Sequence, residues 1–126
     1  MIVLDTSALL YWTLDPAQLS LKAKQAIEQA DRIVISSISV WEIALKVKRH
    51  KLVLPLPVPE YVERLQRLEA LEILAVDVQI WLDNLDLLWE HRDPADRTIV
   101  ALATRFDCSL ITSDRVIADY YQETIW

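Results

Sequence analysis

Five acidic residues lie where an apolar stretch of the sequence gives way to an expected helix: Asp5, Glu42, Asp93, Asp96 and Asp114. Each has an ordinary explanation, because Asp, Glu and Ser are favoured at helix N-termini as caps and beside the helix dipole. Several carboxylates in one place, however, would repel one another and raise each other's pKa unless a cation neutralised them. Together they predict a site for Mg²⁺, or for Mn²⁺ as a substitute, since these hard ions bind carboxylate oxygens. Such an ion can activate water for attack on a phosphodiester.

The capping interpretation stays open at three of these positions. Residues 39–42 read Ser-Val-Trp-Glu, which fits the S-x-x-E capping box and makes Glu42 its acidic member. Asp93 precedes a proline at the first position of a helix, which is a typical N-cap arrangement. Asp114 is placed to cap the last helix. Capping can therefore account for each acidic residue by itself, whereas a shared metal site would account for acidic residues at all of these positions.

The apolar pattern predicts elements that would bring these residues together. Short β-branched runs predict strands at 2–4, 32–36, 71–76 and 109–112, with an edge strand at 124–126. Helical periodicity predicts helices at 8–14, 21–30, 60–68, 78–88 and 115–121, and two more that open at Ser39 and Pro94. This alternation is typical of a three-layer α/β/α fold with a mainly parallel central sheet. In such sheets ligands bind beyond the carboxyl ends of the strands, where every strand-to-helix junction lies.

Composition narrows the class of protein. A chain of 126 residues predicts a single domain over 1–126, and the N-terminus has neither a basic segment nor a long apolar run, so we expect a cytoplasmic protein with no membrane contact. The sequence contains no glycine, which excludes the glycine-rich phosphate loops and the G-x-S-x-G nucleophile elbow. One cysteine, Cys108, and two histidines exclude a zinc cluster of the usual spacing. The net charge of −6 argues against a generally basic nucleic-acid binder, although local basic patches remain compatible with it.

Basic residues are expected on both sides of the acidic positions. Lys46 and Arg49 follow Glu42 at i+4 and i+7 on one helical stripe, and Arg97 and Arg115 follow Asp96 and Asp114 directly. The stripe is either a solvated face with a Glu42–Lys46 ion pair or a lane that leads phosphates toward the metal. Both interpretations stay open.

Four segments in order resemble PIN-domain ribonucleases, and specifically the VapC-like toxins of type II toxin–antitoxin systems: LDTSALLYW, SSISVWEIALKVKRHKLVLP, HRDPADRTIVALA and LITSDRVIADY. The resemblance implies a Mg²⁺-dependent endoribonuclease that hydrolyses RNA by metal-activated water and leaves a 5′-phosphate and a 3′-hydroxyl. It also implies a homodimer and a cognate antitoxin whose C-terminal segment lies across the acidic site.

Residue by residue, the resemblance assigns the catalytic and metal-binding quartet to Asp5, Glu42, Asp96 and Asp114. We favour Asp96 as the third ligand and keep Asp93 as a water-mediated or substitute one. The supporting hydroxyls are Thr6 or Ser7 and Thr112 or Ser113, and the RNA contacts are Lys46, Arg49, Arg97 and Arg115. The chain departs from the family pattern at His50, where relatives often carry glycine, and at Ala95, where they often carry phenylalanine.

Two other functions are weighed against this one. An aspartate-based phosphatase with Asp5 as nucleophile would be expected to carry a second acid two residues later, but Ser7 stands there. A non-catalytic PIN-like scaffold would not need all four acids. The five tryptophans are expected in the core or at a subunit interface rather than in base stacking, and His50 and His91 are less favoured as general bases than water activated by the metal.

Overall fold

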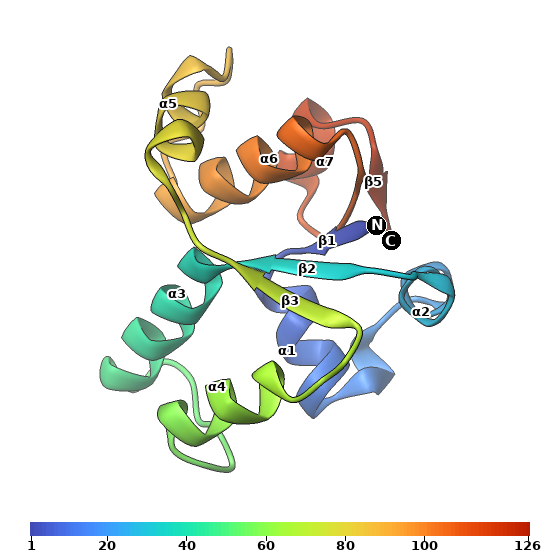
Figure 1. The fold of residues 1–126 in the computed structure, drawn as a ribbon, viewed down its shortest axis with the longest axis vertical. Coiled ribbons are helices and arrows are strands. Elements are labelled where there is room, and N and C mark those ends of the chain that lie inside the picture. The colour runs from blue at the N-terminus through green and yellow to red at the C-terminus, as the bar shows by residue number, and fades with distance from the viewer.

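The computed structural model describes residues 1–126 and contains one five-stranded sheet (Figure 1). Its strands are β1 (Ile2–Leu4), β2 (Ile33–Ser36), β3 (Leu71–Leu74), β4 (Ser109–Ile111) and β5 (Thr124–Ile125). They lie in the order β3-β2-β1-β4-β5, and every neighbouring pair is parallel. The expected parallel sheet is therefore confirmed, with β5 at one edge as predicted.

Helices cover both faces of the sheet. Helices α1 (Thr6–Leu14), α2 (Leu21–Gln29), α3 (Ser37–Lys48) and α4 (Val58–Gln66) lie on one side, and α5 (Val78–Asp86), α6 (Pro94–Phe106) and α7 (Arg115–Tyr120) lie on the other. A short 3₁₀ helix (Pro16–Gln18) follows α1. The three-layer α/β/α arrangement is thus confirmed. None of the helices combines the length and the apolar character that a membrane span needs.

The two apolar cores follow from the alternation of side chains along the strands. In β1, Ile2 and Leu4 face the core under α1, α2 and α4, whereas Val3 faces the core under α5, α6 and α7. All three are buried, as expected for a central strand of a parallel sheet covered on both faces. The carboxyl end of β1 is consequently held rigidly at the centre of the sheet edge, where the residues that follow it begin α1.

The capping box predicted at Ser39 and Glu42 is wrong. Helix α3 already begins at Ser37, and its N-cap is Ser36, whose Oγ accepts a hydrogen bond from the amide of Ile38 at 3.2 Å. The reason is that β2 runs into α3 without a loop, so the first unpaired amides lie before Ser39. Ser39 is instead a buried helical residue, and Glu42 lies in the second turn rather than the first.

A second expectation needs correction at the start of α6. We expected Asp93 and Asp96 at a strand-to-helix junction, but α6 follows α5 through an irregular segment and not a strand. Helix α4 also begins two residues earlier than predicted, at Val58, because Pro57 is its N-cap and Pro59 is tolerated in the first turn. The other boundaries differ from prediction by a few residues at most.

Two residues have a positive φ, and each ends a long helix. His50 (φ 57°) follows α3, and Asp107 (φ 49°) follows α6. At both ends the next amide donates back into the last turn, from Lys51 to the Lys46 carbonyl and from Cys108 to the Ala103 carbonyl. Glycine is the usual residue at this position of the motif. The departure from the family pattern at His50 therefore falls on a left-handed residue.

Candidate metal-binding site

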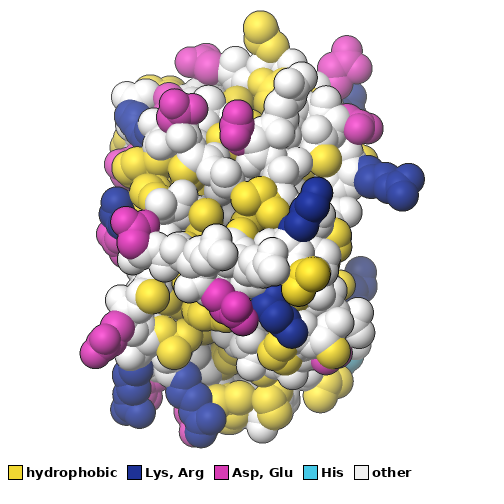
Figure 2. Space-filling model, turned by 90° about the vertical axis from the view of Figure 1, so that its right-hand side faces the viewer, with side chains coloured by type: hydrophobic (Ala, Val, Ile, Leu, Met, Phe, Trp, Pro, Cys, Tyr) yellow, Lys and Arg dark blue, Asp and Glu magenta, His cyan; other side chains and the backbone are white.

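One cleft at the carboxyl ends of the strands collects all the acidic residues singled out in the sequence. It has a volume of about 220 Å³ and no apolar residue in its lining, which consists of Asp5, Thr6, Ser7, Glu42, Lys46, Asp93, Asp96, Ser113 and Asp114. The starts of α1, α6 and α7 and the second turn of α3 contribute these side chains. On the face that lies to the right in Figure 1, positive and negative side chains are interspersed (Figure 2). The cleft, with five carboxylates and one lysine in its lining, is a local concentration of negative charge.

Asp5 is the buried carboxylate of the cleft, with 6% of its surface exposed. One oxygen accepts a hydrogen bond from the amide of Ala8 at 2.7 Å, and the other accepts one from the hydroxyl of Thr112. The pKa of Asp5 is raised to about 6, chiefly by burial and to a smaller extent by the charges of Asp96 and Asp114, while the two hydrogen bonds oppose this rise. Asp5 therefore caps α1 and is also an anion that a nearby cation would stabilise.

Thr112 links Asp5 to Asp114 by accepting a hydrogen bond from the Asp114 amide at 3.0 Å. The Asp114 carboxylate accepts one from the amide of Val116 at 2.8 Å, which confirms its predicted role as the cap of α7. Among the four proposed hydroxyls, Thr112 is thus the one that orients a carboxylate. Ser7 and Ser113 are exposed in the cleft, whereas the Thr6 hydroxyl donates to Ser39 Oγ at 2.9 Å.

The structure distinguishes Asp93 from Asp96. Asp93 accepts a hydrogen bond from the amide of Asp96 at 3.0 Å and is the N-cap of α6, as predicted. Asp96 is more buried, and its carboxylate lies 2.8 Å from Nε2 of His91. Burial raises the pKa of Asp96 and the charges of Asp93 and Asp114 raise it further, while the contact with His91 lowers it. This difference supports Asp96 as the third ligand, which remains a prediction.

His91 contacts the carboxylate of Asp96, a role that the sequence did not indicate. Its imidazole lies against Trp89 at a centroid distance of 4.7 Å, and Trp89 stacks on Tyr120 at 4.8 Å with 9° between the planes. These contacts fix the ring that holds Asp96. No spacing rule could have indicated this role, because His91 lies in an irregular segment five residues before its partner.

Arg97 has a different role from the expected RNA contact. Its guanidinium donates to the backbone carbonyls of Asn84, Leu87, Trp89 and His91, and to the side-chain oxygen of Asn84. The segment between α5 and α6 has no regular structure to satisfy its carbonyls, and arginine carries five donors in a rigid fork that can do so. We therefore withdraw Arg97 as an RNA ligand and assign it to holding this segment.

The other three basic residues proposed to contact RNA lie at different distances from the cleft lining. Lys46 lines the cleft, whereas Arg49 and Arg115 are exposed residues outside its lining. Glu42 and Lys46 form no ion pair with each other, so the first explanation of the stripe is wrong. Glu42 and Lys46 instead share a wall of the cleft.

The donor set fits a hard divalent cation. Five carboxylates and three hydroxyls line the cleft without a single sulfur ligand, which is the chemistry that Mg²⁺ and Mn²⁺ prefer. No three acidic, histidine or cysteine residues meet closely enough to hold one ion among them. In proteins Mg²⁺ usually retains several waters and is held by one or two carboxylates.

Comparison with known proteins places these residues in a wider context. The family model described as "PIN domain" matches residues 2–123. Ribonuclease VapC22 of Mycobacterium tuberculosis is 29% identical over 129 aligned residues, which cover 99% of this chain and 98% of that protein.

Solved structures share the fold at lower sequence identity. A toxin–antitoxin complex from Klebsiella pneumoniae superposes with a TM-score of 0.68 at 22% identity, over 100% of this chain and 97% of that chain. The toxin VapC20 of Mycobacterium tuberculosis, which cleaves the sarcin–ricin loop, superposes with a TM-score of 0.64 at 14% identity, over 97% and 98% of the two chains. FitAcB from Neisseria gonorrhoeae gives 0.65 at 21% identity, over 93% and 90%.

Proposed function

Because the chain belongs to the PIN-domain family, we propose that it is a Mg²⁺-dependent endoribonuclease and the toxin of a type II toxin–antitoxin pair. The observation that carries the proposal is the wholly polar cleft that Asp5, Glu42, Asp96 and Asp114 line together. The similarity to a ribonuclease over nearly the whole length of both chains supports the same reaction. A buried carboxylate with a raised pKa inside a polar cleft is typical of catalytic sites, which favours an enzyme over a non-catalytic scaffold.

In this proposal the acidic residues hold the ion and orient it. A bound Mg²⁺ would supply activated water and stabilise the attacking and leaving oxygens of the phosphodiester. Asp5 is held from two directions, by the Ala8 amide and the Thr112 hydroxyl, so its position does not depend on the ion. His91 holds Asp96 from the opposite wall. Glu42 extends into the same space from α3, with no hydrogen bond to restrain its carboxylate.

Substrate phosphates have a basic residue available inside the cleft. Lys46 lines it, and a lysine ammonium binds phosphate as a compact charge with three donors. Arg49 and Arg115 are exposed near the ends of α3 and α7, where they would extend this contact to neighbouring phosphates. We therefore retain three of the four proposed RNA contacts: Lys46, Arg49 and Arg115.

The proposed protein partners are a second copy of the chain and an antitoxin. The outer face of α5 exposes Val78, Leu82 and Leu85, and such apolar patches mark protein contacts. The Klebsiella pneumoniae neighbour is itself a toxin–antitoxin complex. An antitoxin tail that carries Arg or Lys would replace the charge of the ion in the cleft, so its affinity should fall as salt or Mg²⁺ rises.

Cleavage of cellular RNA tests the proposal directly. The purified protein should cut RNA in Mg²⁺ or Mn²⁺ and not in EDTA, and sequencing of the new 5′ ends should show discrete sites with 5′-phosphates. Asp77→Asn is a matched control, because Asp77 also caps a helix, through the Ile80 amide at 2.9 Å, but lies outside the cleft. Activity should survive in that control and disappear in Asp5→Asn. Metal-independent cleavage, or equal activity of the two variants, would contradict the proposal.

A further inference from the structure

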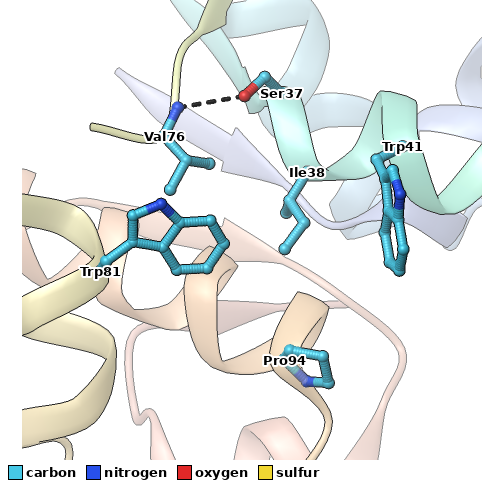
Figure 3. A pocket seen from close by; sticks show the side chains of 6 residues that line it. All are labelled: Ser37, Ile38, Trp41, Val76, Trp81 and Pro94. Atoms are coloured by element: carbon cyan, nitrogen blue, oxygen red, sulfur yellow. Dashed lines mark hydrogen bonds between the residues drawn. The ribbon is translucent and has the colours of Figure 1, made fainter. Parts of the chain in front are cut away.

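A second cavity, which we call the tryptophan pocket, opens beside the acidic cleft. It has a volume of about 410 Å³ and is lined by Ser37, Ile38, Trp41, Val76, Trp81 and Pro94 (Figure 3). The two indole rings stand on opposite sides of Ile38, with Pro94 below them. The five tryptophans are expected in the core or at a subunit interface; none is fully buried, but Trp12, Trp89 and Trp126 pack against the two cores. Trp41 and Trp81 are 55% and 45% exposed.

The walls of the tryptophan pocket are held in place by the fold. Ser37 at the start of α3 accepts a hydrogen bond from the amide of Val76 at 3.1 Å. This bond ties the segment after β3 to the first turn of α3, and Trp81 follows on α5. The pocket therefore lies between three elements that the central sheet and this bond position relative to one another.

The tryptophan pocket and the acidic cleft are neighbours at two points of the chain. Trp41 immediately precedes Glu42, and Pro94 immediately follows Asp93. In both pairs one residue lines the pocket and the other lines the cleft. The pocket and the cleft therefore border each other along the backbone at two places, and a base joined to a phosphate in the cleft would have the pocket beside it.

The two cavities differ in polarity, as the charged phosphate and the uncharged base of a nucleotide do. The cleft is charged throughout, whereas the pocket is lined by no charged residue, and its one hydroxyl already accepts the Val76 amide. Flat aromatic walls bind nucleobases by stacking, and they do so with every base because each has a π-face. From this juxtaposition we infer that the tryptophan pocket binds a nucleobase of the RNA beside the phosphate held in the cleft. The inference rests on the proposed function.

The position of the pocket favours a base over a second protein chain. The most exposed apolar side chains of α5, Val78 at 75% and Leu85 at 76%, lie outside the pocket lining and offer a protein partner a surface of their own. The pocket instead adjoins the proposed catalytic cleft at Trp41–Glu42 and at Asp93–Pro94, and this adjacency selects a group covalently joined to the substrate phosphate.

Cleavage of an RNA with single missing bases tests the inference. The substrate is the RNA fragment whose cleavage site the preceding experiment maps, remade with one abasic ribonucleotide at each position around the cut. We compare kcat/KM for the wild type, Trp41→Leu and Trp81→Leu, which keep apolar bulk but remove the indole. Trp41→Phe and Trp81→Phe restore an aromatic ring, and Leu21→Ala on α2 is the control for an exposed apolar residue outside the pocket.

For the wild type, we expect one abasic position to lower kcat/KM about tenfold, mainly through KM. Each leucine variant should lose a similar factor on the intact RNA and then show no further loss at that abasic position. The phenylalanine variants should recover most of the activity, and Leu21→Ala should keep the abasic effect unchanged.

Three results would overturn the inference. Leucine variants that keep the full abasic effect would show that the base binds elsewhere. Leucine variants that lose no activity, but change molecular mass in light scattering, would assign the pocket to contact between copies of the chain. A wild-type protein that cleaves no RNA would overturn the proposed function itself, whereas the first two results would leave that function intact.

Discussion

The two walls of the acidic cleft are built in different ways. On the wall formed by β1 and β4, Asp5 and Asp114 are linked through Thr112, which directly follows β4, and each also accepts a hydrogen bond from a helix amide. On the wall formed by α6, Asp96 is held by His91 in an irregular segment. That segment is in turn held by the guanidinium of Arg97.

The carboxylates on the two walls are therefore held in position in two different ways. The strand wall inherits its rigidity from the sheet, since its residues follow the buried strand β1 and the buried end of β4. The α6 wall has no such support, and several backbone carbonyls depend on one side chain. We therefore expect the strand wall to tolerate substitution with little loss of stability, and the α6 wall to be sensitive to changes far from the cleft.

The largest expected effect is the loss of activity in Asp5→Asn. The amide keeps the shape of the carboxylate but removes the charge that holds the ion, so RNA cleavage should fall at least about 100-fold. The fold should remain, because an amide oxygen can still accept the Ala8 hydrogen bond. Circular dichroism and single-turnover cleavage would check both parts. Normal activity would remove Asp5 from the site.

The same variant should change how stability depends on pH. Because the pKa of Asp5 is raised to about 6 from 3.8, the folded protein without metal binds this proton more tightly than the unfolded chain does. Its stability should therefore fall as pH rises from about 4 to about 6, by up to about 3 kcal/mol. Asp5→Asn should lose this slope and be at least as stable as wild type at pH 7. A large drop in Tm at pH 7 would instead mean that capping dominates.

On the α6 wall, Arg97→Lys should lower stability by about 2–3 kcal/mol. A lysine keeps the charge but cannot reach carbonyls in several directions, so it leaves backbone acceptors of the segment unpaired. Urea denaturation would measure the change. Arg105→Lys on the same helix is the control, because the ion pair of Arg105 with Asp83, at 3.4 Å, lies at the surface, and a shift within about 0.5 kcal/mol is expected. Equal losses in the two variants would contradict the role of Arg97.

The smallest effect concerns Asp93. Removal of its cap in Asp93→Ala should cost about 0.5–2 kcal/mol, whereas Asp93→Ser should keep both stability and most activity because serine also caps helices. Asp96→Asn should lose activity with little change in stability. Thermal unfolding and cleavage assays on the three variants would decide between the carboxylates. Activity lost in Asp93→Ser but kept in Asp96→Asn would move the ligand to Asp93.

The strand wall could be predicted from the sequence because its signals are local. An apolar run followed by Asp5, and another followed by Asp114, each indicate a strand that ends at a helix cap, and parallel packing brings the ends together. The alternation of strands and helices predicted the three layers for the same reason.

The α6 wall could not be predicted, because its partners meet only in the folded chain. The sequence places Arg97 beside Asp96, which indicates a charged site, but the carbonyls that take its donors lie up to 13 residues away in a segment without periodicity. The start of α3 is predicted wrongly from the sequence for a related reason. Ser36 and Ser39 are equally good caps by type, and only the end of β2 decides between them.

The two left-handed residues have a consequence for the unfolded chain. His50 and Asp107 occupy positions where glycine carries no steric cost, so each bears a local strain of about 1–2 kcal/mol in the folded state. A glycine at either place would relieve that strain, but it would also widen the range of backbone conformations open to the disordered polymer. With no glycine anywhere in its sequence, this polypeptide has a comparatively restricted unfolded ensemble, so less conformational entropy is lost when the sheet forms.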